Sequence, residues 1–217
     1  FIDCINVITE PGDILYIPPG CPHDGISVDA SLNYSVGFRA PAQKDLLTGL
    51  ADYLIENDIQ GVRYTDQNRQ LSANIGAITS QDLQQVRGLL QGLIDDPKLL
   101  ASYFGSYITH AKHDLDATEP DPHYNADEIA EYLEEGSVLA RLGGLRVCYI
   151  QEQEDSDIQL FINGMTIVLP ASAKRTVLQL SELTVLDQAT AAEFAHDPEK
   201  LQLLTQLINL GYWYFIE

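Results

Sequence analysis

The histidine at position 23 closes the motif GDILYIPPGCPH, residues 12–23, in which a strand-like run leads into a turn rich in proline. Imidazole titrates near neutral pH and is the commonest metal ligand among side chains. By default, a histidine in such a loop is a surface residue or makes a local hydrogen bond. One imidazole does not hold a metal ion firmly against water, so a metal site at His23 requires partner ligands.

Two small polar residues follow on the next strand-like run, ASLNYSVGFRA, residues 30–40. Because successive side chains of a strand point to opposite faces, Asn33 and Ser35 share a polar, uncharged face that could line a cavity. Two interpretations remain open. These residues contact a cosubstrate or the surroundings of a metal, or they make ordinary hydrogen bonds inside a sheet.

A second pair of histidines, His110 and His113, lies three residues apart in a predicted helix, with Asp114 and Asp116 nearby. A zinc site there would need at least one further ligand. We favour a solvated helix end, where cationic side chains suit the negative end of the helix dipole.

Composition and periodicity divide the chain into three parts and predict an α+β protein. Residues 1–42 are strand-like, with proline-rich turns that cannot donate to a sheet ladder. Residues 43–115 change to the helical period, and residues 116–123 form an acidic, proline-containing linker. Residues 124–217 combine helices and hairpins in a pattern typical of a small winged-helix-like domain.

Local signals place the elements within these parts. Apolar spacing predicts helices over 43–57, 80–95 and 96–115, the second with Ser80 as N-cap and the third with Asp96. Asn125 and Glu128 form a capping box that begins a further helix. Local patterns in the last third of the chain predict two hairpins, two helical stretches and a buried final strand. The hairpins turn at Gly143-Gly144 and Asn163-Gly164, the helical stretches lie near 177–194 and 197–210, and the strand lies in GYWYFIE.

The spacing of Gly12, Pro18, Gly20 and His23 matches the second cupin motif, although Ser27 stands where that motif usually has Asn. Longer segments resemble the bacterial JmjC-type ribosomal oxygenases along nearly the whole chain. The matching segments are EPGDILYIPPGCPHDG, NYSVGFRAP, LADYL, DEIAEYL, VLARLGGLRV and GYWYF.

The resemblance implies an iron(II)- and 2-oxoglutarate-dependent enzyme that hydroxylates an arginine of a large-subunit ribosomal protein. It implies the last strands of a JmjC double-stranded β-helix in residues 1–42, a helical dimerisation region and a C-terminal winged helix. His23 then corresponds to the distal iron ligand, with Asn33 and Ser35 as candidates for contact with 2-oxoglutarate. The family's His-x-Asp pair is not found in residues 1–22, which contain no histidine.

The chain carries a formal net charge of −20, from 32 acidic and 12 basic residues. So few cations argue against strong direct binding to nucleic acid and against anionic membrane surfaces. The acidity serves solubility, or it attracts a basic protein partner. No apolar run approaches the roughly 20 residues of a membrane span. The three cysteines show no paired spacing, which is typical of a reduced, cytoplasmic protein.

The first residues, FIDCINVIT, are already strand-like and lack Met. We therefore expect the chain to be a fragment whose barrel strands lack their partners, and to be inactive alone. The alternative function is a non-catalytic, cupin-derived module for dimerisation and protein binding.

Overall fold

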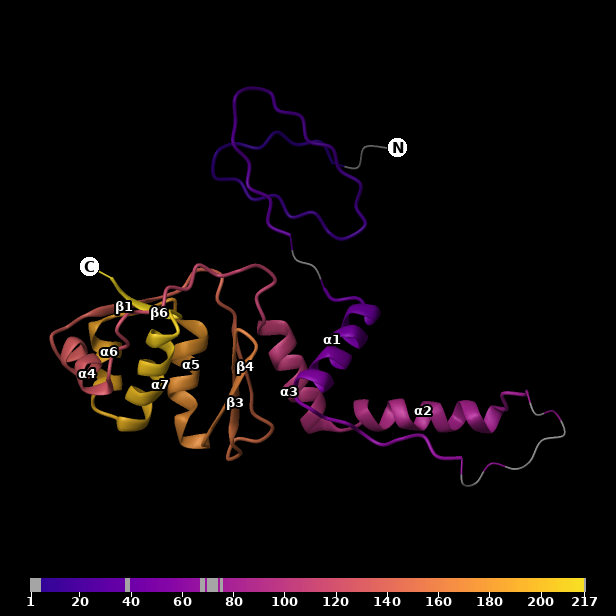
Figure 1. Cartoon of the computed structure of the whole chain (residues 1–217). Helices are drawn as coiled ribbons and strands as arrows, with labels where there is room; N and C mark the ends of the chain where they lie inside the picture. The colour runs from indigo at the N-terminus through magenta and orange to yellow at the C-terminus, as the bar shows by residue number, and fades with distance from the viewer. Residues whose placement is uncertain (1–4, 38–39, 67–68, 70–73, 75, 217) are drawn as a thin grey trace. The chain divides into compact units, whose positions relative to one another are not determined.

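The computed structural model describes the chain except residues 1–4, 38–39, 67–68, 70–73, 75 and 217. It divides into two compact units, Phe1–Pro41 and Ala42–Glu217, which are described separately (Figure 1). No helix in the described residues is long and apolar enough to cross a membrane.

The described residues of the first unit, 5–37 and 40–41, contain turns but no hydrogen-bonded strand. Two predicted turns are present: the Asp13 N–H donates to the Glu10 carbonyl at 3.0 Å, and the Cys21 N–H donates to the Pro18 carbonyl at 3.2 Å. The strands predicted within 1–42 are not formed there. A strand is held by ladder hydrogen bonds to a neighbour, and these runs have no such neighbour among the described residues.

Three helices open the second unit: α1 (Gln43–Glu56), α2 (Ser80–Ile94) and α3 (Pro97–Thr109). Asp96 caps α3 as predicted, accepting hydrogen bonds from the N–H groups of Lys98 and Leu99, and Pro97 occupies its first turn. The N-cap of α2 is Thr79 rather than the predicted Ser80. Its hydroxyl accepts from the Asp82 N–H and the Asp82 carboxylate accepts from the Thr79 N–H, which makes a capping box.

The C-terminal part begins with α4 (Ala126–Glu134), whose capping box of Asn125 and Glu128 is confirmed. Three further helices and a 3₁₀ turn follow. Their bounds are η1 (Ala171–Ala173), α5 (Lys174–Glu182), α6 (Gln188–Ala195) and α7 (Pro198–Asn209). The single helical stretch predicted near 177–194 is therefore two helices.

Six strands form two antiparallel sheets in the described residues. The first has the order β5-β1-β6 and the second the order β2-β3-β4. Their bounds are β1 (Val138–Arg141), β2 (Val147–Ile150), β3 (Ile158–Ile162), β4 (Met165–Leu169), β5 (Val185–Leu186) and β6 (Trp213–Ile216).

The two predicted hairpins have different outcomes. Asn163 and Gly164 join β3 to β4 with Ile162 opposite Met165, and both turn residues have positive φ, at 47° and 84°. This hairpin is confirmed, since such a two-residue turn favours Asn-Gly. The hairpin at Gly143-Gly144 is wrong: β1 pairs with β5 and β6, whereas β2 pairs with β3. Pairing with strands distant in sequence prevails there over the local turn signal.

The core lies between α4, α5, α6, α7 and the two sheets. Its largest fully buried members include Trp213, Phe194, Leu204, Leu139 and Leu160. Burial of Trp213 at the start of β6 confirms that the last strand enters the core.

Strand β3 is covered on both faces. Ile158, Leu160 and Ile162 enter the main core, while Phe161 points to the other face, where its ring leaves no room for a Cβ on Gly105 of α3. Figure 1 shows β3 and β4 between α5 and α3. This double burial explains why IQLFI reads as a nearly continuous apolar run.

Polar bonds fix the end of α3 to the β3–β4 turn. The Ser106 hydroxyl donates to the Gly164 carbonyl at 2.6 Å, and the Ala111 N–H donates to Asn163 Oδ1 at 3.0 Å. The Gly164 N–H in turn donates to Thr109 Oγ1 at 3.1 Å. Helix α3 therefore packs on the second sheet. The predicted division of the chain into residues 43–115, a linker at 116–123 and a domain at 124–217 stays a prediction.

Candidate functional site

His23 lies just after the tight turn Pro18–Cys21, in which Gly20 has a φ of 79°. Its side chain is exposed, and its Nδ1 lies 3.2 Å from the Cys21 carbonyl oxygen. When Nδ1 carries the ring proton, it donates to that carbonyl and leaves the Nε2 lone pair free. This is the tautomer in which metal-binding histidines are commonly held by a backbone carbonyl.

Asn33 and Ser35 are both exposed in the first unit. Within the described residues, neither side chain takes part in any of the hydrogen bonds found. Their predicted role in contacting 2-oxoglutarate stays a prediction.

Within the described ranges, no group of three or more His, Cys, Asp or Glu side chains is placed to hold a metal ion. A facial iron site needs three protein ligands, and His23 supplies one. The described residues therefore do not complete the site by themselves.

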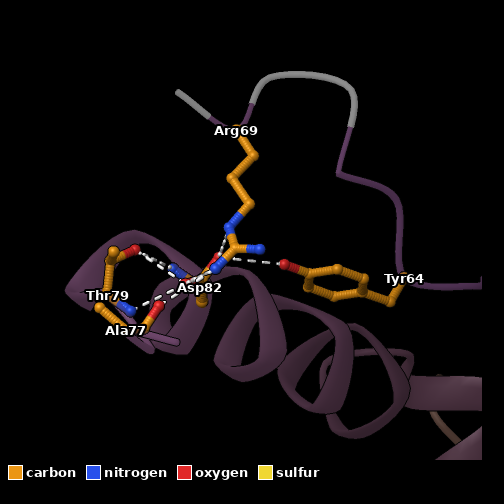
Figure 2. Close-up of polar contacts among 5 residues, drawn as sticks. All are labelled: Tyr64, Arg69, Ala77, Thr79 and Asp82. Atoms are coloured by element: carbon orange, nitrogen blue, oxygen red, sulfur yellow. Dashed lines mark hydrogen bonds and ion pairs between the residues drawn. The ribbon is translucent and has the colours of Figure 1, made fainter. Parts of the chain in front are cut away.

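The densest polar cluster that the structure describes surrounds Asp82 in the first turn of α2, and it was not predicted (Figure 2). Asp82 Oδ2 accepts from the Thr79 N–H at 2.8 Å and from the Thr79 hydroxyl at 2.9 Å. Arg69 Nε lies 3.0 Å from Asp82 Oδ1, and the Tyr64 hydroxyl donates to the same oxygen at 3.3 Å. Arg69 also donates to the Ala77 carbonyl at 3.2 Å.

These contacts shift two titrations. Hydrogen bonds from the Thr79 backbone and hydroxyl hold the pKa of Asp82 below its ordinary value, and Arg69 adds to the effect. Burial raises the pKa of Tyr64, and the neighbouring Asp82 carboxylate raises it further. A carboxylate with this many donors is a structural anchor, because few of its lone pairs remain for a ligand. The Thr-x-x-Asp spacing of residues 79–82 was the sequence signal for it.

Family models match two regions of the chain. A JmjC domain matches residues 2–46, which include His23, Asn33 and Ser35. A ROXA-like winged helix matches residues 92–214, more than half of the chain.

The chain belongs to the ROXA-like winged helix family. The matched region begins before α3, so it includes the helix that packs on the second sheet.

Relatives and solved structures agree with this assignment. The chain is 38% identical over 207 residues to the ribosomal protein uL16 3-hydroxylase of Escherichia coli, covering 95% of the chain and 53% of that protein. It is 24% identical to a probable ribosomal oxygenase of Haemophilus influenzae, covering 90% of the chain and 50% of that protein. The chain thus spans about half the length of the curated relatives it matches.

Two solved structures of the ribosomal oxygenase YcfD from Escherichia coli also match. One, in complex with cobalt and 2-oxoglutarate, has a TM-score of 0.73 at 34% identity, covering 84% of this chain and 48% of that one. The other, with cobalt and succinic acid, has a TM-score of 0.72 at the same identity and coverage. The resemblance to JmjC-type ribosomal oxygenases and the α+β fold with a winged helix are thereby confirmed.

Proposed function

We propose that the chain is the C-terminal part of an iron(II)- and 2-oxoglutarate-dependent oxygenase that hydroxylates an arginine of a large-subunit ribosomal protein in the cytoplasm. The observation that carries the proposal is the JmjC match over residues 2–46, which places GDILYIPPGCPH within that domain. The relatives named as ribosomal oxygenases support the substrate class. The charge of −20 suits a basic ribosomal protein and disfavours strong direct binding to nucleic acid.

In this proposal His23 is one iron ligand, using the Nε2 atom that its contact with the Cys21 carbonyl leaves free. Asn33 and Ser35 lie near the 2-oxoglutarate. Iron and 2-oxoglutarate supply the oxidising chemistry when bound. Because His23 is one ligand of three, the 217-residue chain alone is inactive.

The activity test uses the longer protein that contains this chain. It is incubated with iron(II), 2-oxoglutarate and ribosomal protein uL16, and the product is analysed by mass spectrometry. We expect a mass gain of one oxygen atom on an arginine, and its loss in His23→Ala. Absence of any product with uL16 or other large-subunit proteins, together with no iron binding, contradicts the proposal.

The alternative is a non-catalytic module for dimerisation and protein binding. Iron content and 2-oxoglutarate turnover of the 217-residue chain separate the alternatives when compared with the longer protein. We expect neither in the short chain and both in the longer protein. If both proteins lack iron and turnover, the module is the better account. Turnover by the short chain contradicts the assigned role of His23 as one ligand of an incomplete set.

We also infer that α2 takes part in a homodimer. It exposes an apolar stripe at helical spacing, formed by Leu83 (62% exposed), Val86 (45%), Leu90 (58%) and Ile94 (45%). α3 adds Leu100, Phe104 and Ile108, each about two-fifths exposed. Soluble monomers rarely expose contiguous apolar surface on this scale, and a second copy of the same stripe is a matching cover.

Sedimentation equilibrium of the 217-residue chain tests the dimer. The double variant Val86→Glu/Leu90→Glu places charges within the stripe and is expected to be monomeric. Its matched control, Gln84→Glu/Gln91→Glu, adds the same charge on the exposed flank of α2, about a quarter of a turn from the stripe, and is expected to stay dimeric. A monomeric wild-type chain contradicts the inference.

A further inference from the structure

A polar groove of about 430 Å³ lies within the second unit, between the end of α1, the middle of α3 and the β3–β4 hairpin. α1 contributes Tyr53, Glu56 and Asn57 to it, and α3 contributes Ser102 and Ser106, which are one helical turn apart. Gly164 and Thr166 of the hairpin complete the lining.

The walls of the groove are fixed by specific contacts. The Tyr103 hydroxyl donates to the Leu46 carbonyl at 2.6 Å, which ties α3 to α1. A Cβ on Gly49 would lie 2.8 Å from the Tyr107 ring, so this glycine permits the close approach of the two helices. The hydrogen bond from Ser106 to Gly164 holds the hairpin side. The groove is therefore held on its three sides in the folded chain.

The lining has a surplus of acceptors and no cation. Glu56 is its charged member, and it makes no ion pair with any residue in the described parts of the chain. Helix α1 ends at the groove with no basic residue in its last turn, so no cation of the helix itself lies at the negative end of its dipole. The carbonyls of Tyr53, Leu54 and Ile55 accept backbone N–H groups there. Asn57 donates its Nδ2 to the Tyr53 carbonyl at 2.9 Å, which leaves its Oδ1 as a further acceptor.

An aromatic ring lines the same groove. Tyr53 is half-buried and packs against Tyr103 with the ring centroids 5.8 Å apart. A guanidinium group stacks on aromatic rings and presents five N–H donors in a plane, whereas an ammonium group is a compact, strongly hydrated point charge. A carboxylate, a helix C-terminus, hydroxyl groups and a tyrosine ring together suit a guanidinium group better than an ammonium group.

We propose that this groove binds an arginine side chain of a basic polypeptide, with Glu56 as its charge partner and Tyr53 as its stacking surface. The inference rests on the proposed function in one respect, because a basic ribosomal protein would supply such a side chain. The groove itself is a binding site, and no part of the hydroxylation chemistry depends on it.

The experiment measures binding of three short peptides to the 217-residue chain by two-dimensional NMR titration at low salt. The peptides are identical except at one central position, which holds arginine, lysine or citrulline. Citrulline keeps the shape of arginine and removes its charge. We expect saturable shifts at Tyr53, Ser102 and Gly164 with the arginine peptide, weaker binding of lysine, and no saturation with citrulline.

Two variants with the same change of charge locate the site. Glu56→Gln removes the groove carboxylate, and Glu131→Gln removes an exposed carboxylate of α4, a helix that packs on α6 and α7 and does not line the groove. Since Glu56 is exposed, we expect Glu56→Gln to weaken binding about threefold to fivefold. Glu131→Gln should change it by less than about 1.5-fold, because its carboxylate belongs to another helix away from the groove.

Equal weakening by the two variants would mean attraction to the general negative charge, and it overturns the site. The proposed site is also overturned if the chemical shifts change at residues outside the groove, or if the citrulline peptide binds as well as the arginine peptide. It is overturned too if a second copy of the chain covers the groove in solution. None of these outcomes bears on hydroxylation by the longer protein, which is measured separately. If the longer protein hydroxylates its substrate but the 217-residue chain fails this titration, the proposed arginine site is wrong and the proposed function still stands.

Discussion

The first unit carries the sequence motif of a JmjC domain but few contacts of its own, whereas the second unit has an extensive buried core. In residues 5–37, large apolar side chains such as Ile14 (96% exposed) and Tyr34 (87%) lie open to solvent. In the second unit Trp213, Phe194 and Leu204 are each at most 1% exposed. The motif of the first unit is therefore recognisable from its sequence although its apolar side chains are not buried in this chain.

The largest expected effect tests that contrast directly. Trp213→Ala removes a fully buried ring from the core and should lower the free energy of unfolding by about 3–5 kcal/mol. Tyr16→Ala, in the first unit, removes a ring that is 76% exposed and should change it by less than about 0.5 kcal/mol. Urea unfolding followed by circular dichroism measures both. A similar loss in both variants would show that the first unit has a core of its own.

A second pair of variants compares the packed helix α3 with the apolar helix α2. In Gly105→Ala, the new methyl group meets the Phe161 ring, and we expect a loss of about 1–3 kcal/mol in the free energy of unfolding. Gly88→Ala makes the same change in α2, where nothing lies within 4 Å. That variant should gain about 0.5–1 kcal/mol from helix propensity. Equal effects would mean that α3 does not pack on β3 as described.

The turn at Asn163 gives a smaller effect. Asn163→Ala loses the hydrogen bond from the Ala111 N–H and the one to the Tyr212 hydroxyl, and it places alanine at a positive φ. We expect a loss of about 2 kcal/mol in the same unfolding measurement. Asn163→Gly relieves the backbone but not the lost bonds, so it should recover about half of that loss. No recovery would contradict the backbone contribution.

The smallest effect concerns pH at the Asp82 cluster. The folded-state pKa of Asp82 lies below the ordinary value of 3.8, so its contribution to stability is complete above that value and is lost as the pH falls through the folded-state pKa. Asp82→Asn should therefore lower the melting temperature most near neutral pH, with the difference shrinking below about pH 4. Asp127→Asn, an exposed acid in the first turn of α4, is the control. A difference that is independent of pH would contradict the role of the charge.

Local signals predicted the elements whose causes are local. The Asp96 cap, the Asn125–Glu128 capping box and the Asn163-Gly164 hairpin were all found where the sequence indicated them. Each is decided by hydrogen bonds or backbone angles within a few residues. The cap of α2 was misplaced by one residue, because Thr79 and Ser80 are chemically alike and only the reciprocal bonds with Asp82 distinguish them.

Features decided by distant partners were missed. Strand β1 pairs with β5 and β6, whose residues lie more than 40 positions away, so the Gly143-Gly144 signal was misleading. Arg69 and Tyr64 reach Asp82 through the loop before α2, and no spacing in the sequence announces that approach. For the candidate metal site, the motif predicted His23 and its turn. The role of His23 as a ligand stays a prediction, since no group of three or more metal-ligating side chains lies together in the described residues.

Strand β3, covered by the main core on one face and by α3 on the other, has a consequence for exchange with solvent. Amide protons in a strand enclosed on both sides are released only when the whole cooperative unit opens. Within a single chain the apolar stripe of α2 is uncovered, so the amide protons of α2 are released by local fraying unless a second copy covers the stripe. A hydrogen–deuterium exchange map would therefore show the slowest protons at Leu160 and Phe161. Residues whose amide protons exchange as slowly as those of Leu160 and Phe161 belong to the same cooperative unit. If such residues occur both before and after the predicted linker 116–123, the unit extends across it.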